Sequence, residues 1–427
     1  MQFRHAEHQQ MGLHTLVTDK FKTTALVLNI QRPLLPGLVT RSALLPHVLT
    51  RGSARYPSVR AMQRQLDGMY GSYLHGDVYK LGERQIVQFR LEIPNGKYLP
   101  GKPELLEEAI AFLDEVLTEP VRENGLLKES FVALEKDALR RRVEGLFNSK
   151  MQYAVIRALE VMCEHEPYRL YSGGRIEDLA AITPATLTAD YEEMLATAPM
   201  DLFVVGDVDA DLVEALVKRR FRLPERSVQK LPPTSLLTTP AIEKHVEDRF
   251  DVNQGQLVIG LRAPAHYASD DHYTMMAYNG VLGAFAHSKL FMNVRERESL
   301  AYTARSRYDS QKGLLMIQAG IDIGNYEKAL RVIREQLDAM VAGDISDVEL
   351  EQTRAMLLNT YREAYDSPGA LINLAFESRV AGRERSIEDL IAAIPHIGKE
   401  EIQRVARGVK LDTIYFLRDK ETVSAHA

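Results

Sequence analysis

The chain repeats one stretch of sequence at a spacing of almost half its length. Ile176-Glu-Asp-Leu-Ala-Ala-Ile182 recurs as Ile387-Glu-Asp-Leu-Ile-Ala-Ala-Ile394, and each copy precedes an expected helix and then an apolar segment that begins at Asp201 or Asp412. Both pairs of starting points lie 211 positions apart in a chain of 427 residues. Solenoid repeats have periods of roughly 20–50 residues, so this spacing instead predicts the duplication of a whole domain.

A proline-rich segment separates the two copies. Residues Leu223–Pro240 contain four prolines and show no amphipathic period, which is typical of an extended linker. We therefore expect a first domain over residues 1–222, a linker over 223–240 and a second domain over 241–427.

Each half mixes expected strands and helices without strict alternation. A β-rich opening strand is expected over 23–30 in the first half and over 255–261 in the second, and helical blocks follow at 131–163 and 347–380. Helix starts are marked by a capping box at Ser346-Asp-Val-Glu349 and by Pro184. This order favours an α+β fold in which helices pack on one face of a mainly antiparallel sheet.

Composition and charge narrow the functional classes. With 45% hydrophobic residues, 26% charged residues and a net charge of −6, the chain has an average globular composition. Nothing here favours a nucleic-acid or membrane partner, and no apolar run approaches the roughly 18 residues that would span a bilayer. The single cysteine, Cys163, excludes an intrachain disulfide and a cysteine-based zinc site. We expect a cytoplasmic protein.

The segment Ser288–Tyr302 carries two groups that could hold a peptide backbone. Arg295 and Tyr302 lie seven residues apart, which is two helical turns if the helix persists, so both could point the same way. A guanidinium and a phenol can grip a peptide carbonyl without reacting with it. Taken alone, Arg295 is a surface arginine paired with Glu296 or Glu298, and Tyr302 is a half-buried strand residue. The apolar side of the segment is formed by Leu290, Phe291, Val294 and Leu300.

These features resemble the M16 zinc peptidases, also called the insulinase or pitrilysin type. The family's progression of His-Pro-Tyr, Gly, Ile-x-x-Leu and Val-Val-Gly-Asp is similar to His165-Glu-Pro-Tyr168, Gly174, Ile176-Glu-Asp-Leu179 and Val204-Val-Gly-Asp207. The resemblance covers most of the chain. It implies two duplicated domains of the LuxS/metallohydrolase-like fold, in a chain the size of the small bacterial subunits that pair with a second chain. It also implies that Arg295 and Tyr302 bind substrate, facing a zinc site across a cavity.

The zinc motif of that family is missing. Two histidines and a glutamate in a His-x-x-Glu-His helix would bind the metal and polarise its water, but this pattern occurs nowhere in the chain. The motif aligns with Ala43-Leu-Leu-Pro-His47, in which only His47 remains and Pro46 replaces the general base. A further zinc-binding glutamate would follow Glu135 and falls at or near Arg142. We expect no catalytic residue, no metal ligand and a packed or cavity-lining His47.

Other histidines give weaker signals. His5 and His8 have a helical spacing but lie at a terminus that we expect to be mobile. His165 is expected to be structural, and His272 follows two aspartates that indicate a helix N-terminus.

The resemblance therefore implies a non-catalytic, substrate-binding subunit of a zinc-dependent M16-type peptidase complex. The chain itself would bind no cofactor, and zinc is expected on a partner chain with His-x-x-Glu-His; a homodimer is the other arrangement. The substrate would be a peptide. One alternative is a purely structural or binding scaffold without a role in proteolysis, as the core subunits of the respiratory bc1 complex are. Another is an independent metalloenzyme with different ligands.

Overall fold

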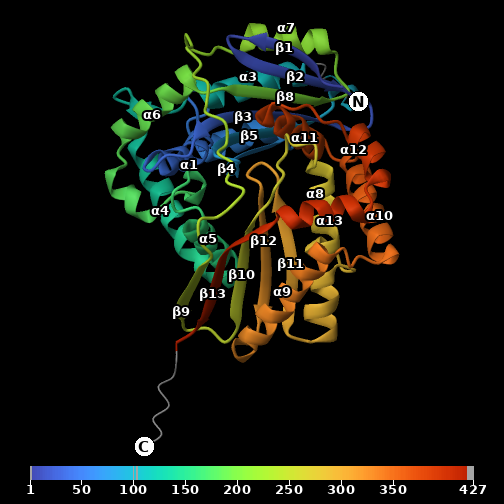
Figure 1. The fold of residues 1–427 in the computed structure, drawn as a ribbon. Helices are drawn as coiled ribbons and strands as arrows, with labels where there is room; N and C mark the ends of the chain where they lie inside the picture. The colour runs from blue at the N-terminus through green and yellow to red at the C-terminus, as the bar shows by residue number, and fades with distance from the viewer. Residues whose placement is uncertain (1, 100, 102–103, 421–427) are drawn as a thin grey trace, which may run out of the picture. The chain divides into compact units, whose positions relative to one another are not determined.

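The computed structural model describes residues 2–99, 101 and 104–420. These residues form two compact units, each built around its own sheet (Figure 1). Unit 1 takes its described residues from 1–144, 170–233 and 366–372, and unit 2 takes them from 145–169, 234–365 and 373–427. The units therefore do not follow chain order, because residues 145–169 pack with the second sheet.

Unit 1 contains a six-stranded sheet in the order β1-β2-β8-β3-β5-β4. Only the β2–β8 pair is parallel among its described strand pairs. The central strand β3 is buried along almost its whole length, as its apolar sequence Ala-Leu-Val-Leu-Asn-Ile predicts. The strands are β1 (Arg4–His8), β2 (Met11–Val17), β3 (Thr23–Pro33), β4 (Tyr73–Leu81), β5 (Arg84–Pro94) and β8 (Met200–Gly206).

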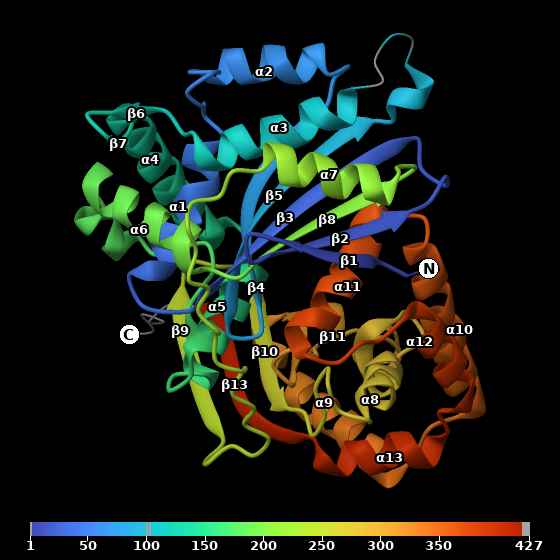
Figure 2. The same cartoon turned by 90° about the horizontal axis from the view of Figure 1, so that it is seen from above.

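Helices of unit 1 bury the apolar face of this sheet in one large core. Figure 2 shows α3 and α7 running over the strands. A small hairpin, β6 (Arg122–Glu123) and β7 (Leu126–Leu127), precedes α4. The helices are α1 (Leu38–Leu49), α2 (Val59–Gly68), α3 (Leu105–Thr118), α4 (Glu129–Gly145), α6 (Pro184–Thr197) and α7 (Ala210–Arg220).

Unit 2 contains a five-stranded sheet in the order β11-β12-β10-β13-β9, in which only β13–β9 is parallel. Without β1, the sheet of unit 1 has the same strand order, chain direction and single parallel pair, so the duplication is visible in the topology. The expected α+β fold with mainly antiparallel sheets is confirmed. The strands are β9 (Lys244–Phe250), β10 (Gly255–Arg262), β11 (Ala301–Asp309), β12 (Leu314–Ile321) and β13 (Lys410–Asp419).

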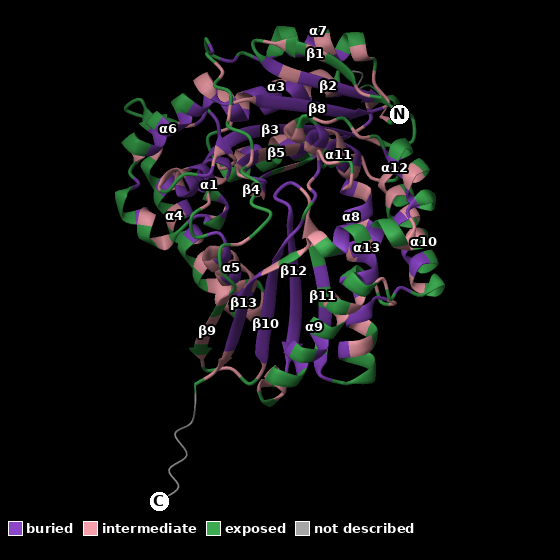
Figure 3. Cartoon of the chain, in the orientation of Figure 1, coloured by how far each residue is buried: buried purple, intermediate pink, exposed green. Residues whose placement is uncertain are grey.

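One face of this second sheet packs on a core of helices, and α5 covers part of its other face. Figure 3 shows β10, β12 and β13 mostly as buried strands. None of the described helices is long and apolar enough to cross a membrane. The helical elements are α5 (Lys150–Met162), α8 (His272–Asn279), η5 (Gly280–Ala284), η6 (Phe291–Arg297), α9 (Tyr326–Ala342), α10 (Asp347–Ala364), α12 (Ile387–Ala393) and α13 (Lys399–Gly408), together with α11 (Pro368–Ala381), whose residues up to 372 belong to unit 1.

Candidate functional site

The positions predicted for the zinc motif lie on α1 of unit 1, where Ala43 and Pro46 are buried. Ala43 is only 1% exposed within the core. Pro46 is buried inside the helix and lies so close to Gly76 of β4 that a Cβ on this glycine would stand 3.0 Å from the proline. A methyl group and a proline ring offer no ligand atom, so these two positions cannot hold a metal ion.

The neighbouring charges form a bridge of two arginines around one glutamate. Glu135 of α4 has a side chain that is 8% exposed; Arg51 donates to its Oε1 from Nε at 2.6 Å, and the Arg51 Nη2 atom lies 2.6 Å from the same oxygen. The Nη1 atom of Arg142 lies 3.8 Å from the other carboxylate oxygen. The Glu135 carboxylate is thus neutralised by the chain's own cations.

His47 remains beside this bridge as a neutral group. Burial lowers the pKa of His47, and the positive charge of Arg142 lowers it further. A fixed cation at this place also disfavours a metal cation. Among the described residues, no three His, Cys, Asp or Glu side chains gather closely enough to hold a metal ion. The residues present at the former zinc position therefore do not fit zinc.

Arg295 lies in unit 2 on η6, a π-helical stretch that contacts β11. Its guanidinium sits 4.7 Å from the centre of the Phe291 ring, and its Nε lies 3.5 Å from Glu296 Oε1. The side chain is 44% exposed. Such an exposed ion pair contributes little free energy, so the guanidinium stays available for a ligand.

Tyr302 is the second residue of β11 and is 67% exposed, not half-buried. The helical stretch ends at Arg297, and Ser299 then adopts a positive φ of 51° that turns the chain into the strand. A register shift between Ala301 and Thr303 places a β-bulge at the tyrosine. Arg295 and Tyr302 are therefore presented by two different elements, not by two turns of one helix.

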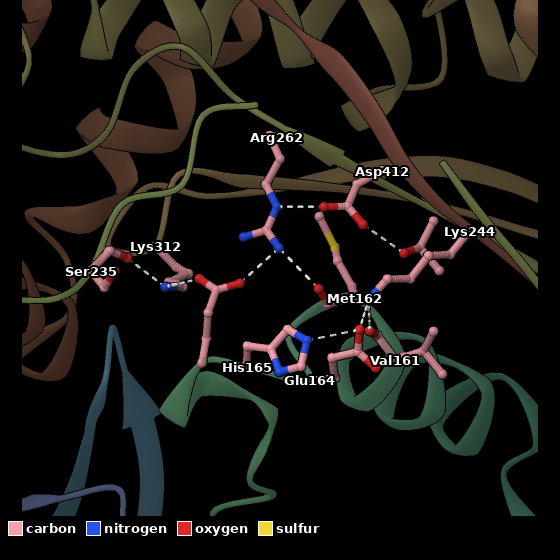
Figure 4. Close-up of polar contacts among 11 residues, drawn as sticks. Val161, Met162, Glu164, His165, Ser235, Lys244, Arg262, Lys312 and Asp412 are labelled. Carbon is pink, nitrogen blue, oxygen red and sulfur yellow. Dashed lines mark hydrogen bonds and ion pairs between the residues drawn. The ribbon is translucent and has the colours of Figure 1, made fainter. Parts of the chain in front are cut away.

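A buried network of charges in unit 2 was not predicted from the sequence. Arg262 of β10 is 1% exposed and donates to Asp412, to the Met162 carbonyl and to Glu166 at 2.7–3.0 Å (Figure 4). Lys312, which is fully buried, lies 2.5 Å from Glu166 and also donates to the Ser235 carbonyl. Burial alone would raise the pKa of Glu166, but the hydrogen bonds from Arg262 and Lys312 outweigh it and lower the pKa.

Through these contacts, the carboxyl end of α5 at Met162 and the chain at Ser235 are bonded to residues of the sheet of unit 2 and of the turn after β11. Glu166 stands inside the His165-Glu-Pro-Tyr168 run, where it separates the histidine from the proline. Tyr168 donates from its hydroxyl to Asp309. No long-range signal in the sequence links Glu166 to Arg262 and Lys312, about 100 and 150 positions away, so only the fold reveals these pairs.

The other histidines differ in their surroundings. His165, which was expected to be structural, has a side chain that is 90% exposed and lies 3.3 Å from Glu164. His5 and His8 lie in β1, which pairs with β2, so the expected mobile terminus is wrong for the described residues. The His5 Nδ1 atom lies 2.6 Å from the Nδ1 atom of buried His14, whose Nε2 in turn meets Asp201 at 2.9 Å. His272 begins α8, as expected, and burial lowers its pKa to about 3.

Comparison with known proteins points to one family. Residues 181–357 match the model of the peptidase M16 inactive domain. Over 419 residues, the chain is 38% identical to the "Probable inactive metalloprotease YmfF" of Bacillus subtilis (strain 168), covering 98% of each chain.

Solved structures agree with this match. A conserved protein from Enterococcus faecalis V583 is 30% identical and superposes with a TM-score of 0.90 over 98% of this chain and 99% of that one. A peptidase M16 inactive domain from Pseudomonas fluorescens is 17% identical and superposes with a TM-score of 0.80, again over 98% and 99% of the two chains.

Proposed function

Because this chain belongs to the M16 peptidase family as an inactive member, we propose that it binds peptide and leaves hydrolysis to a zinc-bearing partner chain. The observation that carries this proposal is the contrast between two sets of residues. The positions predicted for the zinc motif carry buried Ala43 and Pro46, with the charge of Arg142 acting on His47 beside them. Arg295 and Tyr302, in comparison, stay exposed.

Arg295 and Tyr302 have the chemistry for holding a peptide backbone. The guanidinium offers several N–H donors and the phenol offers one O–H donor, and both suit peptide carbonyl oxygens. In a complex with a catalytic subunit, these donors would fix the position of the scissile carbonyl, which lowers the entropic part of the barrier. They would not take part in bond cleavage themselves.

The partner we propose is an M16 chain that carries His-x-x-Glu-His. A homodimer would bring together two copies of the same substituted site, so it would still lack zinc ligands. A heterodimer is therefore the arrangement that supports peptidase activity. We propose a cytoplasmic location, where the lone Cys163 would stay reduced.

The test is peptide hydrolysis by the chain alone, by a His-x-x-Glu-His partner alone and by the pair. We expect activity of the pair that exceeds the sum of the separate chains. Arg295→Ala or Tyr302→Phe should lower kcat/KM of the pair by about tenfold to a hundredfold, the range for loss of a positioning contact. Arg331→Ala, which removes an exposed arginine of α9, should have no effect. Unchanged activity of the Arg295→Ala pair would refute this role.

A scaffold without a role in proteolysis is the second candidate. It is favoured by the contacts of Arg295 with Phe291 and Glu296, because a purely structural side chain would make the same ones. The two candidates differ in one measurable property. A scaffold would assemble with its partner but would leave the partner's peptide hydrolysis unchanged.

A further inference from the structure

The strand that carries Tyr302 also carries two exposed arginines. β11 is the end strand of its sheet and pairs only with β12 among the described strands (Figure 1). Its side chains alternate, so Ala304 and Ser306 are buried while Arg305 and Arg307 are exposed. The two guanidinium groups therefore extend from the same face of an edge strand.

No described acid forms an ion pair with either arginine. Arg305 lies opposite Gln318 of β12, and the Gln318 Oε1 atom accepts hydrogen bonds from its Nε at 3.0 Å and its Nη2 at 2.9 Å. A neutral amide orients this guanidinium but leaves its charge uncompensated. Arg307 lies opposite Met316, which offers it no carboxylate. Two like charges on one strand face repel each other unless a ligand neutralises them.

The acids nearest along the chain are engaged elsewhere. Glu296 lies 3.5 Å from Arg295, and Glu298 lies 2.7 Å from Lys328. Asp309 accepts hydrogen bonds from the Tyr168 hydroxyl and from the backbone N–H of Lys312. Asp309 lies two residues after Arg307 on the same face of the strand, and its neutral hydrogen-bond donors leave its charge in place. The strip formed by Arg305 and Arg307 therefore carries two positive charges with one carboxylate at its end, on a chain whose net charge is −6.

We propose that Arg305 and Arg307 select peptides that carry carboxylates at alternate positions. This inference rests on the proposed peptide binding at Arg295 and Tyr302. A strand advances about 3.3 Å per residue, so the two arginines are spaced by roughly 7 Å, as are the side chains at positions i and i+2 of an extended peptide. Guanidinium groups bind carboxylates through paired hydrogen bonds.

The position of Tyr302 fixes where these acids should fall. Tyr302 comes three residues before Arg305 on the same strand. A peptide held at Tyr302 and running along β11 in extended form would bring one acidic side chain to Arg305 and the next alternate one to Arg307. The substrate class is therefore a flexible acidic segment with a Glu-x-Glu spacing.

The test compares two fluorescent peptides that differ only in charge. One contains a Glu-x-Glu pair within a neutral extended sequence, and the other has both glutamates replaced by glutamine. Binding to the full chain is measured by fluorescence anisotropy at low and high salt. We expect the acidic peptide to bind about tenfold to fiftyfold more tightly at low salt, and we expect this preference to shrink at high salt.

Variants of the strip separate charge recognition from backbone binding. Arg305→Gln and Arg307→Gln should each remove about threefold to tenfold of the preference and leave the affinity for the neutral peptide unchanged. Arg305→Lys should keep part of the preference because it keeps the charge. Arg295→Ala should weaken the binding of both peptides by the same factor. Arg331→Gln is the matched control and should change neither affinity.

The outcomes distinguish this inference from the proposed function. Equal binding of the two peptides by the wild-type chain would overturn the acidic specificity and leave peptide binding intact. A preference that survives in the double variant Arg305→Gln/Arg307→Gln would overturn the assignment to these residues. Failure of the full chain to bind either peptide would overturn the proposed peptide-binding function, and the specificity with it.

Discussion

His47 is the one histidine in the segment predicted for the zinc motif, and its neighbours Ala43 and Pro46 offer no ligand atom. A second histidine at position 43 alone would give two nitrogen ligands, but Arg142 would still place a cation near His47, at or near the position predicted for the third ligand. Glu135 cannot substitute for that ligand, because Arg51 already binds its carboxylate at 2.6 Å. At the scale of residues, binding of a metal ion is thus disfavoured by the ion pairs of Glu135 with Arg51 and Arg142 as well as by the missing ligands.

The buried network around Glu166 gives the first prediction. Glu166→Gln leaves Arg262 and Lys312 without the carboxylate that both contact, so we expect the free energy of unfolding to fall by about 3–5 kcal/mol. Glu335→Gln, which affects an exposed pair with Arg331, should cost less than about 1 kcal/mol. Denaturant titrations of both variants measure the difference. Similar losses in the two variants would show that the network adds no stability.

Glu377 gives a prediction about pH. Burial and, to a smaller extent, the charge of Asp309 raise its pKa to about 7, so the folded chain holds a proton there that the unfolded chain releases at a lower pH. Stability from this group is therefore present at pH 4 and is lost as the pH rises to 7. Glu377→Gln should leave stability unchanged near pH 4 and raise it by roughly 2 kcal/mol at pH 8. Thermal melts across this range test the sign; a constant difference would contradict it.

At the scale of elements, the sequence correctly predicted helix starts that depend on neighbouring residues. The capping box at Ser346 and the helix start at Pro184 are both observed, because each depends on residues within one turn. The path between Arg295 and Tyr302 was not predicted. It depends on a positive φ at Ser299, and serine carries no signal for that conformation.

The position of β11 against η5 gives the next prediction. A Cβ added at Gly283 would stand 2.6 Å from the backbone nitrogen of Ser306, so Gly283→Ala must shift η5 or β11. We expect a loss of about 1–3 kcal/mol in stability, as for other overpacked sites, together with weaker peptide binding because Tyr302 lies on the displaced strand. Gly324→Ala, where nothing lies within 4 Å of the added Cβ, should change neither property. Full binding by the Gly283→Ala variant would contradict this coupling.

At the scale of the whole molecule, the repeat at an offset of 211 residues predicted the duplication that the two sheets display. The sequence did not reveal where α5 packs. This helix lies in the first half of the chain, yet its apolar side chains meet Val258 and Tyr415 of the second sheet. Chain order carries no information about such a long-range contact. The division into domains at 1–222, 223–240 and 241–427 therefore stays a prediction about the duplicated sequence.

The reactivity of Cys163 reports whether α5 is packed on the second sheet, because Cys163 is the single cysteine and is fully buried at the end of α5. A fragment of residues 1–233 would contain α5 but neither β10 nor β13, which cover it. We expect a thiol reagent to modify Cys163 slowly in the full chain and at least a hundredfold faster in the fragment, since reaction in the full chain requires an opening that costs several kcal/mol. Adding a fragment of residues 234–427 should restore the protection. A cysteine that stays protected in the first fragment alone would show that α5 is buried without the second sheet.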